Sequence, residues 1–413
     1  MKIAKSKIVN IYLFLVIFYF FTNFIYQIQV PIIILLGGIF ILCMGLGNLR
    51  KGISYTDLFL ILFPITLTLI FLITFNNVEE AIKYIIVIWI LTLSTLILSK
   101  EDLKDNGEKI MKFILLLSGI HVLMTLLYAI IPDFVQTINR IILPINSYNN
   151  NVYEMQHNNI NCGITPIQSI NAIYISVFIG CIFSRLMCKK GNKILNILLF
   201  VFSIIALFLC SKRGVMIAVF VAMLFVIIYL HIKDKNKKFN IVKTIKKVVP
   251  IILIIVLVVF FIEKYFNTAT YIFERFFTQE DITTGRADLY VDVWEYIKES
   301  PIIGNGILTT QEMLNTYAHN IYLQLFCEAG IIGLIVFLIM NISIFHRVCK
   351  LKKVKDEKVI LAIFFFVLFL VYGFTGNPLF DYSIIIPYYL SIAVINNKKY
   401  INEENTINDR EQI

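Results

Sequence analysis

Histidine and arginine residues stand at the ends of the apolar segments of this chain. His319 and Asn320 come directly before a long apolar run that contains Gly330 and Gly333, and Arg286 opens a segment of mixed apolar and acidic residues. An imidazole with an ordinary pKa near 6.5 can accept or give a proton near neutral pH. A guanidinium binds phosphate through charge-assisted hydrogen bonds that are often paired. We therefore expect a site that combines a proton acceptor with anion binding.

A second basic group, Lys212 and Arg213, stands between two apolar runs. A charge at such a boundary costs desolvation energy, so it marks a candidate site. The alternative is that each side chain merely reaches water from a helix end. The argument for function is stronger for Arg213, and Lys212 is retained as a substrate-binding candidate.

The elements that position these residues are predicted to be membrane helices. Mean hydropathy is +0.81 and only 15% of the residues are charged, against roughly 25% in soluble domains. Runs of about 20 apolar residues cross a bilayer as helices, and the runs here are too long and alternate too little for outer-membrane strands. The sequence predicts an all-α polytopic membrane protein with about twelve spans. These are Ile8–Ile25, Pro31–Leu46, Leu58–Phe75, Ala81–Leu98, Ile110–Ile131, Ile167–Met187, Ile194–Cys210, Val215–Ile232, Val248–Ile262, Ile321–Phe345, Val359–Phe374 and Leu379–Ile395.

The basic residues predict which side of the membrane each segment faces. Most of the 37 lysines and arginines fall on one side if the N-terminus is cytoplasmic, as the positive-inside rule requires. We expect a multi-pass protein of the bacterial inner membrane with both termini cytoplasmic. The net charge of +10 then reflects topology and attraction to anionic membrane lipids, and nucleic acid is not an expected partner. The outer segments hold Lys83, Arg140, Lys212, Arg213, Lys264, Arg275, Arg286 and Lys298.

No soluble domain can be separated from the predicted spans. We expect one membrane domain over residues 1–396 and a polar cytoplasmic tail over 397–413. Two long outer loops are predicted, at 132–165 and 263–318, and long loops on a rigid scaffold often carry sites.

Each outer loop contributes a weaker substrate-binding candidate. His157 lies in the asparagine-rich first loop, where it could contact the acceptor sugar or be an ordinary surface histidine. Arg275 lies in the second loop beside Glu274, so a structural ion pair is the alternative for this residue.

Residues Arg286–Ser300 are predicted to form one amphipathic helix that Pro301 ends. At about 100° per residue, the apolar side chains from Leu289 to Ile297 form one stripe and the acidic side chains form the opposite one. A helix with this division lies in the membrane interface with its apolar face down. Arg286 falls on the apolar stripe, so we expect its guanidinium to point toward the lipid headgroups, where a helix N-terminus also attracts anions.

Four more residues near His319 have predicted roles. Asn320 and Tyr322 are candidate substrate contacts. Gly330 and Gly333 are interpreted as packing residues that let another helix approach closely. Glu328, the one acidic residue well inside a span, is expected to be a buried structural partner.

The motifs and their order resemble those of the O-antigen ligase and O-antigen polymerase family. The resemblance is carried by H-N-x9-G-x-x-G over residues 319–333, and by residues 210–214, which are similar to the family's S-R-G element with a lysine inserted. It is also carried by Gly285-Arg286, Trp294 and the P-x-x-G-x-G pattern of residues 301–306. It covers about residues 200 to 335. The first half of the chain is similar only in consisting of membrane spans.

The resemblance implies a GT-C-like glycosyltransferase whose donor is a sugar on polyprenyl (undecaprenyl) pyrophosphate. In the family two arginines and one histidine at the outer face serve the reaction, and by motif they fall on Arg213, Arg286 and His319. The arginines would stabilise the departing pyrophosphate, and the histidine would orient or deprotonate the acceptor hydroxyl. No carboxylate pair or clustered metal-ligand pattern occurs in the sequence. We therefore expect direct displacement with inversion, without a metal or a cofactor.

The acceptor distinguishes a polymerase from a ligase. A polymerase extends another lipid-linked repeat unit, whereas a ligase transfers the glycan to a different lipid or to a protein. The abundance of Ile, Lys and Asn indicates an AT-rich bacterial genome and favours a capsule or exopolysaccharide polymerase, for which a flippase and a chain-length regulator are the implied protein partners. A transporter of lipid-linked saccharide is a third interpretation. It is disfavoured because Glu328 is the one acid near the bilayer midplane.

Overall fold

The computed structural model describes residues 5–26, 28–45, 53–101, 107–158, 160–233, 286–352 and 354–401. All regular structure within these ranges is helical, which confirms the all-α prediction for them. The elements are α1 (Lys5–Thr22), η1 (Asn23–Ile25), α2 (Gln29–Met44), α3 (Tyr55–Thr74), α4 (Val78–Lys100), α5 (Gly107–Ile130), α6 (Pro132–Ile142), α7 (Ile145–Asn158), α8 (Gln168–Cys188), α9 (Lys193–Leu209), α10 (Arg213–Lys233), α13 (Arg286–Glu299), α14 (Thr309–Leu314), α15 (Ile321–Lys350), α16 (Glu357–Tyr372), α17 (Tyr382–Ile395) and α18 (Lys398–Ile401).

Every predicted span that falls in the described ranges coincides with a helix, with ends that differ by a few residues. The predicted span Val248–Ile262, the outer residues 263–285 and the tail beyond 401 lie outside those ranges. Among the described helices, 7 are long and apolar enough to cross a membrane, namely α1, α3, α4, α5, α8, α10 and α15. Helices α2, α9 and α17 are apolar but shorter. The protein is therefore a polytopic membrane protein, and the total number of spans remains a prediction.

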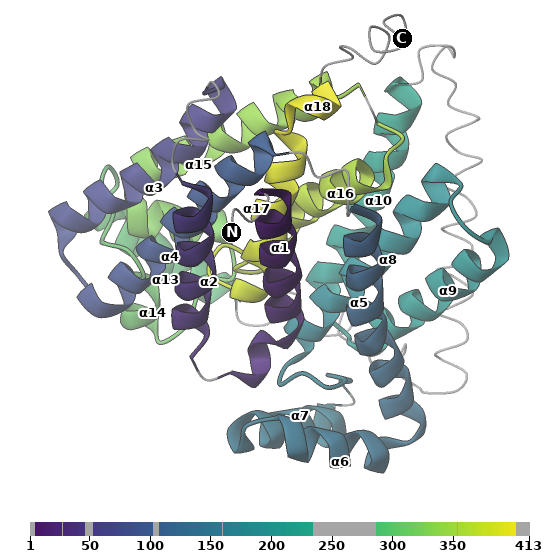
Figure 1. The fold of residues 1–413 in the computed structure, drawn as a ribbon. Helices are drawn as coiled ribbons and strands as arrows, with labels where there is room; N and C mark the ends of the chain where they lie inside the picture. The colour runs from purple at the N-terminus through teal and green to yellow at the C-terminus, as the bar shows by residue number, and fades with distance from the viewer. Residues whose placement is uncertain are drawn as a thin grey trace, which may run out of the picture.

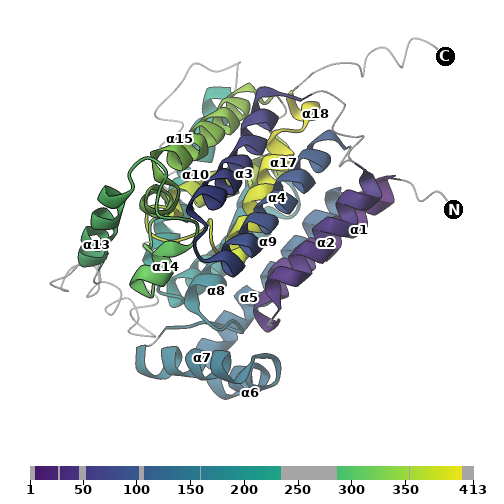
Figure 2. The same cartoon turned by 90° about the vertical axis from the view of Figure 1, so that its left-hand side faces the viewer.

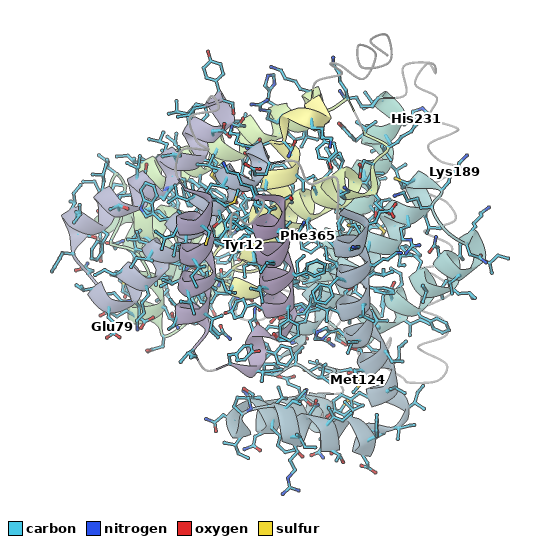
Figure 3. The ribbon with its side chains drawn as sticks, viewed as in Figure 1. Tyr12, Glu79, Met124, Lys189, His231 and Phe365 are labelled. Atoms are coloured by element: carbon cyan, nitrogen blue, oxygen red, sulfur yellow. The ribbon has the colours of Figure 1, made fainter. Side chains whose placement is uncertain are left out.

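Helices α8, α16 and α17 form the centre of the bundle. α10 packs on α16, α5 packs on α8, and α15 packs on α3 (Figures 1 and 2). Tyr388 of α17 stacks on Phe369 of α16 with ring centroids 3.7 Å apart, and its hydroxyl donates to Asn341 of α15 at 2.7 Å. Tyr12 of α1 and Phe365 of α16, which are labelled in Figure 3, are likewise buried. Close packing of this kind holds helices together in lipid, where burial of apolar surface gives little driving force.

The segment 132–165, predicted as a loop, folds into the two helices α6 and α7. They lie across one end of the bundle, opposite the end that carries α18 (Figures 1 and 2). The buried amides of Asn139 and Asn151 both donate to the Gly163 carbonyl, at 3.0 and 3.1 Å. Part of the asparagine content of this segment is therefore structural, because a buried amide needs hydrogen-bond partners.

Candidate active site at the α6–α7 end of the bundle

The turn between α16 and α17, residues 373–381, is where the candidate residues meet. The backbone N–H of Ile321, the first residue of α15, donates to the Gly373 carbonyl at 2.9 Å. Arg286, the first residue of α13, donates from Nη1 to the Thr375 carbonyl at 3.1 Å. The last carbonyls of a helix have no partner within that helix. Here α13 and α15 supply donors to the carbonyls that follow α16, so both helices are fixed to the same turn.

Helix α10 begins against this turn as well. Ser211 has a left-handed backbone, with φ 51°, and reverses the chain after α9, so that Lys212 and Arg213 stand at the start of α10. A Cβ at Gly214 would clash with the Thr375 hydroxyl. The glycine after Arg213 thus allows the first turn of α10 to approach Thr375, whose carbonyl accepts the hydrogen bond from Arg286.

Helix α13 reaches the turn because its apolar stripe packs on the protein. Val293 and Ile297 are buried against Ala318 and Cys327, in and just before α15. The prediction that this stripe faces the lipid interface is therefore wrong for its two buried residues. The guanidinium of Arg286 contacts the Thr375 carbonyl of the protein rather than extending only toward lipid headgroups.

His319 lies in the segment that enters α15 and has an unusual backbone. Its φ is 51°, in the left-handed region, where non-glycine residues are uncommon although histidine is enriched among them. Backbone strain of this kind concentrates at functional sites. The pKa of His319 is lowered to about 4. Burial is the largest cause, and the positive charges of Arg286 and Lys212 contribute to the same shift. The imidazole is therefore neutral at pH 7, and three segments distant in sequence lie within electrostatic range of one another.

The site is an electropositive pole formed by helix N-termini. The N-terminal ends of α10, α13, α15 and α17 all contact or belong to the 373–381 turn or its end. A helix N-terminus carries about half a positive charge and binds anions. Lys212, Arg213 and Arg286 add full charges at two of these ends. Cations at helix N-termini are unfavourable alone, and an anion at this position would offset them.

Asp381 is a carboxylate within electrostatic range of this pole. It caps α17 by accepting the Ser383 N–H at 2.8 Å. Burial raises the pKa of Asp381, while the hydrogen bonds from Ser383 and the charge of Lys212 act in the opposite direction. Asp381 therefore offsets part of the positive charge and gives Lys212 an anionic neighbour.

A break in α15 fixes the loop that carries the P-x-x-G-x-G pattern. Gly330 has φ 60° and ψ −171°, so the helix is interrupted there. The N–H groups of Asn305 and Gly306 donate to the Cys327 and Glu328 carbonyls at 2.9 and 3.0 Å, and Ile331 donates back to the Pro301 carbonyl at 2.9 Å. The loop thus satisfies the backbone groups that the break exposes.

The interpretation of the two glycines in α15 needs one correction. What approaches Gly330 is this loop and not another helix, since a Cβ at Gly330 would clash with the Ile302 carbonyl. A Cβ at Gly333 would clash with the Cβ of Ala329 in the same helix and would meet Ile70 of α3 at an ordinary contact distance, 3.6 Å. Glu328 is buried and accepts hydrogen bonds from the Leu308 N–H and the Gln324 amide, both at 2.9 Å.

Comparison with known proteins places most of this site in one family. Residues 198–338 match the family described as O-antigen ligase. That segment is similar to members of the O-antigen ligase family. No curated protein matches the chain. The O-antigen ligase segment includes Lys212, Arg213, Arg286 and His319, whereas the 373–381 turn that ties them together lies beyond it.

The other predicted site residues have varied positions. Asn320 caps α15, because its side chain accepts the N–H groups of Tyr322 and Leu323 at 3.0 and 3.3 Å. The Tyr322 hydroxyl donates to the Leu370 carbonyl at 2.9 Å. Both therefore help to position His319. His157 is exposed on α7, where its ring stacks on Tyr153 at 4.5 Å, and Arg275 lies outside the described residues.

Thr375, Asp381 and Tyr317 are the site residues that sequence reasoning missed. Tyr317 stacks on Phe380 with centroids 6.1 Å apart. Burial raises the pKa of Tyr317, with added contributions from Glu328 and Asp381. The available signal was a glycine- and proline-containing turn, residues 373–381, between two apolar runs on the same predicted side as His319.

Proposed function

We propose that the protein is an extracytoplasmic polysaccharide polymerase. It transfers a glycan from polyprenyl pyrophosphate to a sugar hydroxyl of another lipid-linked repeat unit. The observation that carries this proposal is the convergence of His319, Arg286 and the Lys212–Arg213 pair on one turn. The family match supports an enzyme of the O-antigen ligase and polymerase type. The donor, the acceptor and the mechanism are parts of the proposal.

The pyrophosphate of the donor binds at the electropositive pole. Arg286 has five N–H donors, and its bond to the Thr375 carbonyl uses Nη1, so other N–H groups remain for phosphate oxygens. Arg213 and Lys212 supply charge from the start of α10. These groups are held in place before the reaction, so they stabilise the leaving pyrophosphate without reorganising.

The transfer itself is a single displacement. The acceptor hydroxyl oxygen attacks the anomeric carbon, the bond from that carbon to the pyrophosphate oxygen breaks, and its electron pair stays on the pyrophosphate. The hydroxyl proton passes to the imidazole of His319 and then to water or the released pyrophosphate. The anomeric configuration inverts, and the fixed cations take the role that a metal ion would otherwise fill.

The lowered pKa of His319 suits this sequence of events. Burial, with a smaller effect of the charges of Arg286 and Lys212, lowers the pKa of His319 and keeps the imidazole neutral, so it is ready to accept a proton. The negative charge of a bound pyrophosphate raises the pKa of His319 toward its ordinary value, because an opposite charge nearby favours the protonated form. The imidazole thus becomes a stronger base once the donor is bound.

The proposed orientation places this site outside the cytoplasm. The distribution of basic residues supports cytoplasmic termini, and α13, α14 and the start of α15 then face outward with α6 and α7. At that surface the bond between the sugar and the polyprenyl pyrophosphate supplies the energy for the transfer. The membrane anchors the lipid of the donor beside the pole.

A ligase is the second candidate, because the matched family carries that description. It shares the donor site and differs in the acceptor. The two functions are separated by supplying purified protein in detergent with synthetic polyprenyl-pyrophosphate oligosaccharide and analysing products by mass spectrometry.

A ladder of longer lipid-linked glycans that is lost in His319→Ala and Arg286→Ala supports the polymerase. Lys298→Ala is the matched control, since Lys298 is an exposed residue of α13 that pairs with Glu295. Transfer only after a foreign acceptor is added supports the ligase. If neither reaction occurs while the substrate crosses liposomes, the protein is a transporter and the proposed enzyme activity is wrong.

A further inference from the structure

A second polar site lies at the opposite end of α3 and α15 from His319. Residues from the first turns of α3 and the last turns of α15 line a pocket of about 940 Å³. Figures 1 and 2 show these two helices side by side. The volume is in the range of small-molecule sites. The lining of this pocket includes none of the candidate active-site residues.

The polar wall of the pocket is basic. It contains His346, Arg347 and Lys350 from α15, together with the hydroxyl side chains of Ser54 and Thr56 from α3. Ser54 is the N-cap of α3, so the positive end of that helix dipole also borders the pocket. Asp57, the acid in this first turn, is buried and pairs with Lys100, which leaves the basic charge of the wall uncompensated by it.

Arg347 is held by a neutral partner. Its Nε donates to the Thr56 hydroxyl at 2.8 Å, and among the described residues no carboxylate forms an ion pair with it. A basic side chain that only needs water can extend from a helix end. Arg347 is instead partly buried and fixed in place, with the rest of its guanidinium available to bind an anion in a paired geometry.

The remaining wall is apolar and continues toward the middle of the membrane. Leu58 and Phe59 of α3 and Ile339 and Ile342 of α15 line it. Leu58 and Ile342 are exposed on the protein surface. Tyr55 stands at the rim with 86% of its surface exposed, a position typical of aromatic residues at a membrane interface. The pocket therefore has a basic head and an apolar body, the pattern of an anionic lipid.

We propose that this pocket binds the phosphate headgroup of an anionic bilayer phospholipid, with an acyl chain along the apolar wall. Arg347 and Lys350 contact the phosphate, and Ser54 and Thr56 contribute hydroxyl groups. The lipid contacts both the start of α3 and the end of α15. At the opposite ends of these helices, Asn76 after α3 donates to the Asn305 carbonyl of the 300–308 loop, and His319 precedes α15. This inference does not depend on the proposed glycosyl transfer.

Lipid retention tests the proposal. The full-length protein is reconstituted in nanodiscs of equimolar phosphatidylglycerol and phosphatidylcholine, released, and analysed by native mass spectrometry. The wild-type protein should retain phosphatidylglycerol in preference. The double variant Arg347→Gln with Lys350→Gln should retain about tenfold less, as expected for the loss of a charge-assisted hydrogen bond, whereas Arg347→Lys should fall between them.

Lys193→Gln is the matched control, because Lys193 is an exposed lysine at the start of α9. It removes one positive charge outside the pocket, and its lipid retention should equal that of the wild type. Equal retention by the double variant and the wild type would overturn the proposal, as would retention of phosphatidylcholine to the same extent. Displacement of phosphatidylglycerol by added polyprenyl phosphate would show that the pocket binds the carrier lipid instead.

Discussion

Arg286 provides the sharpest test of how the site stabilises a leaving pyrophosphate. One N–H of its guanidinium is used by the Thr375 carbonyl at 3.1 Å, and that bond fixes the plane of the group. A lysine at this position keeps the charge but has a single nitrogen. It cannot donate to the Thr375 carbonyl and also form a bidentate pair of hydrogen bonds with a phosphate. Arg286→Lys therefore separates charge from geometry.

The expected size of the effect follows from this contact. Removing one preorganised donor to a developing oxyanion costs about 10²–10³ in rate, or about 2.7–4 kcal/mol. Arg286→Ala should lose that full amount in kcat. Arg286→Lys should lose about 10-fold to 10²-fold, because charge is kept while the paired hydrogen bonds are lost.

The assay is single-turnover release of polyprenyl pyrophosphate with saturating donor, since this isolates the transfer step from binding. Lys298→Ala, on the exposed side of the same helix, should behave as the wild type. If Arg286→Lys is fully active, charge alone is sufficient and the geometric reasoning is refuted. If Arg286→Ala raises only KM for the donor, Arg286 binds the ground state and does not act in the transition state.

Three further outcomes are expected from the structure. NMR titration of protein with labelled histidine should give His319 a pKa of about 4 in the empty site, and added inorganic pyrophosphate should raise that pKa. A pKa near 6.5 in the empty site would contradict the burial of His319 beside Arg286 and Lys212. Because this folded pKa lies below the unfolded one, the neutral imidazole contributes to stability above about pH 6.5, and that contribution is lost as the pH falls toward 4. Gly330→Ala should destabilise the protein by about 1–3 kcal/mol, measured by thermal unfolding in detergent, because φ is 60° there and a Cβ meets the Ile302 carbonyl. Gly38→Ala in α2, where a Cβ meets nothing within 4 Å, should be neutral or slightly stabilising, and equal losses for the two variants would refute the account of the α15 break.

The described helices, and the positions of the three motif residues beside helix ends, were predictable because their signals are local. Long apolar runs require helices in lipid, and His319, Arg286 and Arg213 stand at the ends of such runs. The amphipathic period from Arg286 onward predicted the start of α13, and Pro301 predicted its end. None of these inferences needed knowledge of which helices are neighbours.

The turn of residues 373–381 could not be predicted as the meeting point. Thr375 takes part through its backbone carbonyl, and the residue type does not indicate which backbone carbonyls accept a hydrogen bond from a side chain. Asp381 has the ordinary appearance of a helix cap. Its proximity to Lys212 depends on the packing of α10 on α16, which joins segments far apart in the chain.

The errors of the sequence interpretation arise from the same cause. Periodicity indicated that α13 has an apolar face, but it did not identify α15 as the surface that covers Val293 and Ile297. Composition suggested a polar loop at 132–165, whereas buried amides of Asn139 and Asn151 support two helices there. In each case the residue pattern did not identify the groups that these side chains pack against or bind.

The most direct test of the central claim is whether His319 and Arg286 act in one site. Single-turnover rates should be measured for His319→Ala, Arg286→Ala and the double variant, with the wild type as reference. Residues that act together in one transition state have non-additive effects, so the account predicts that the double variant is little slower than the slower single variant. A double-variant loss equal to the product of the two single losses would show that the residues act independently and would contradict a shared site.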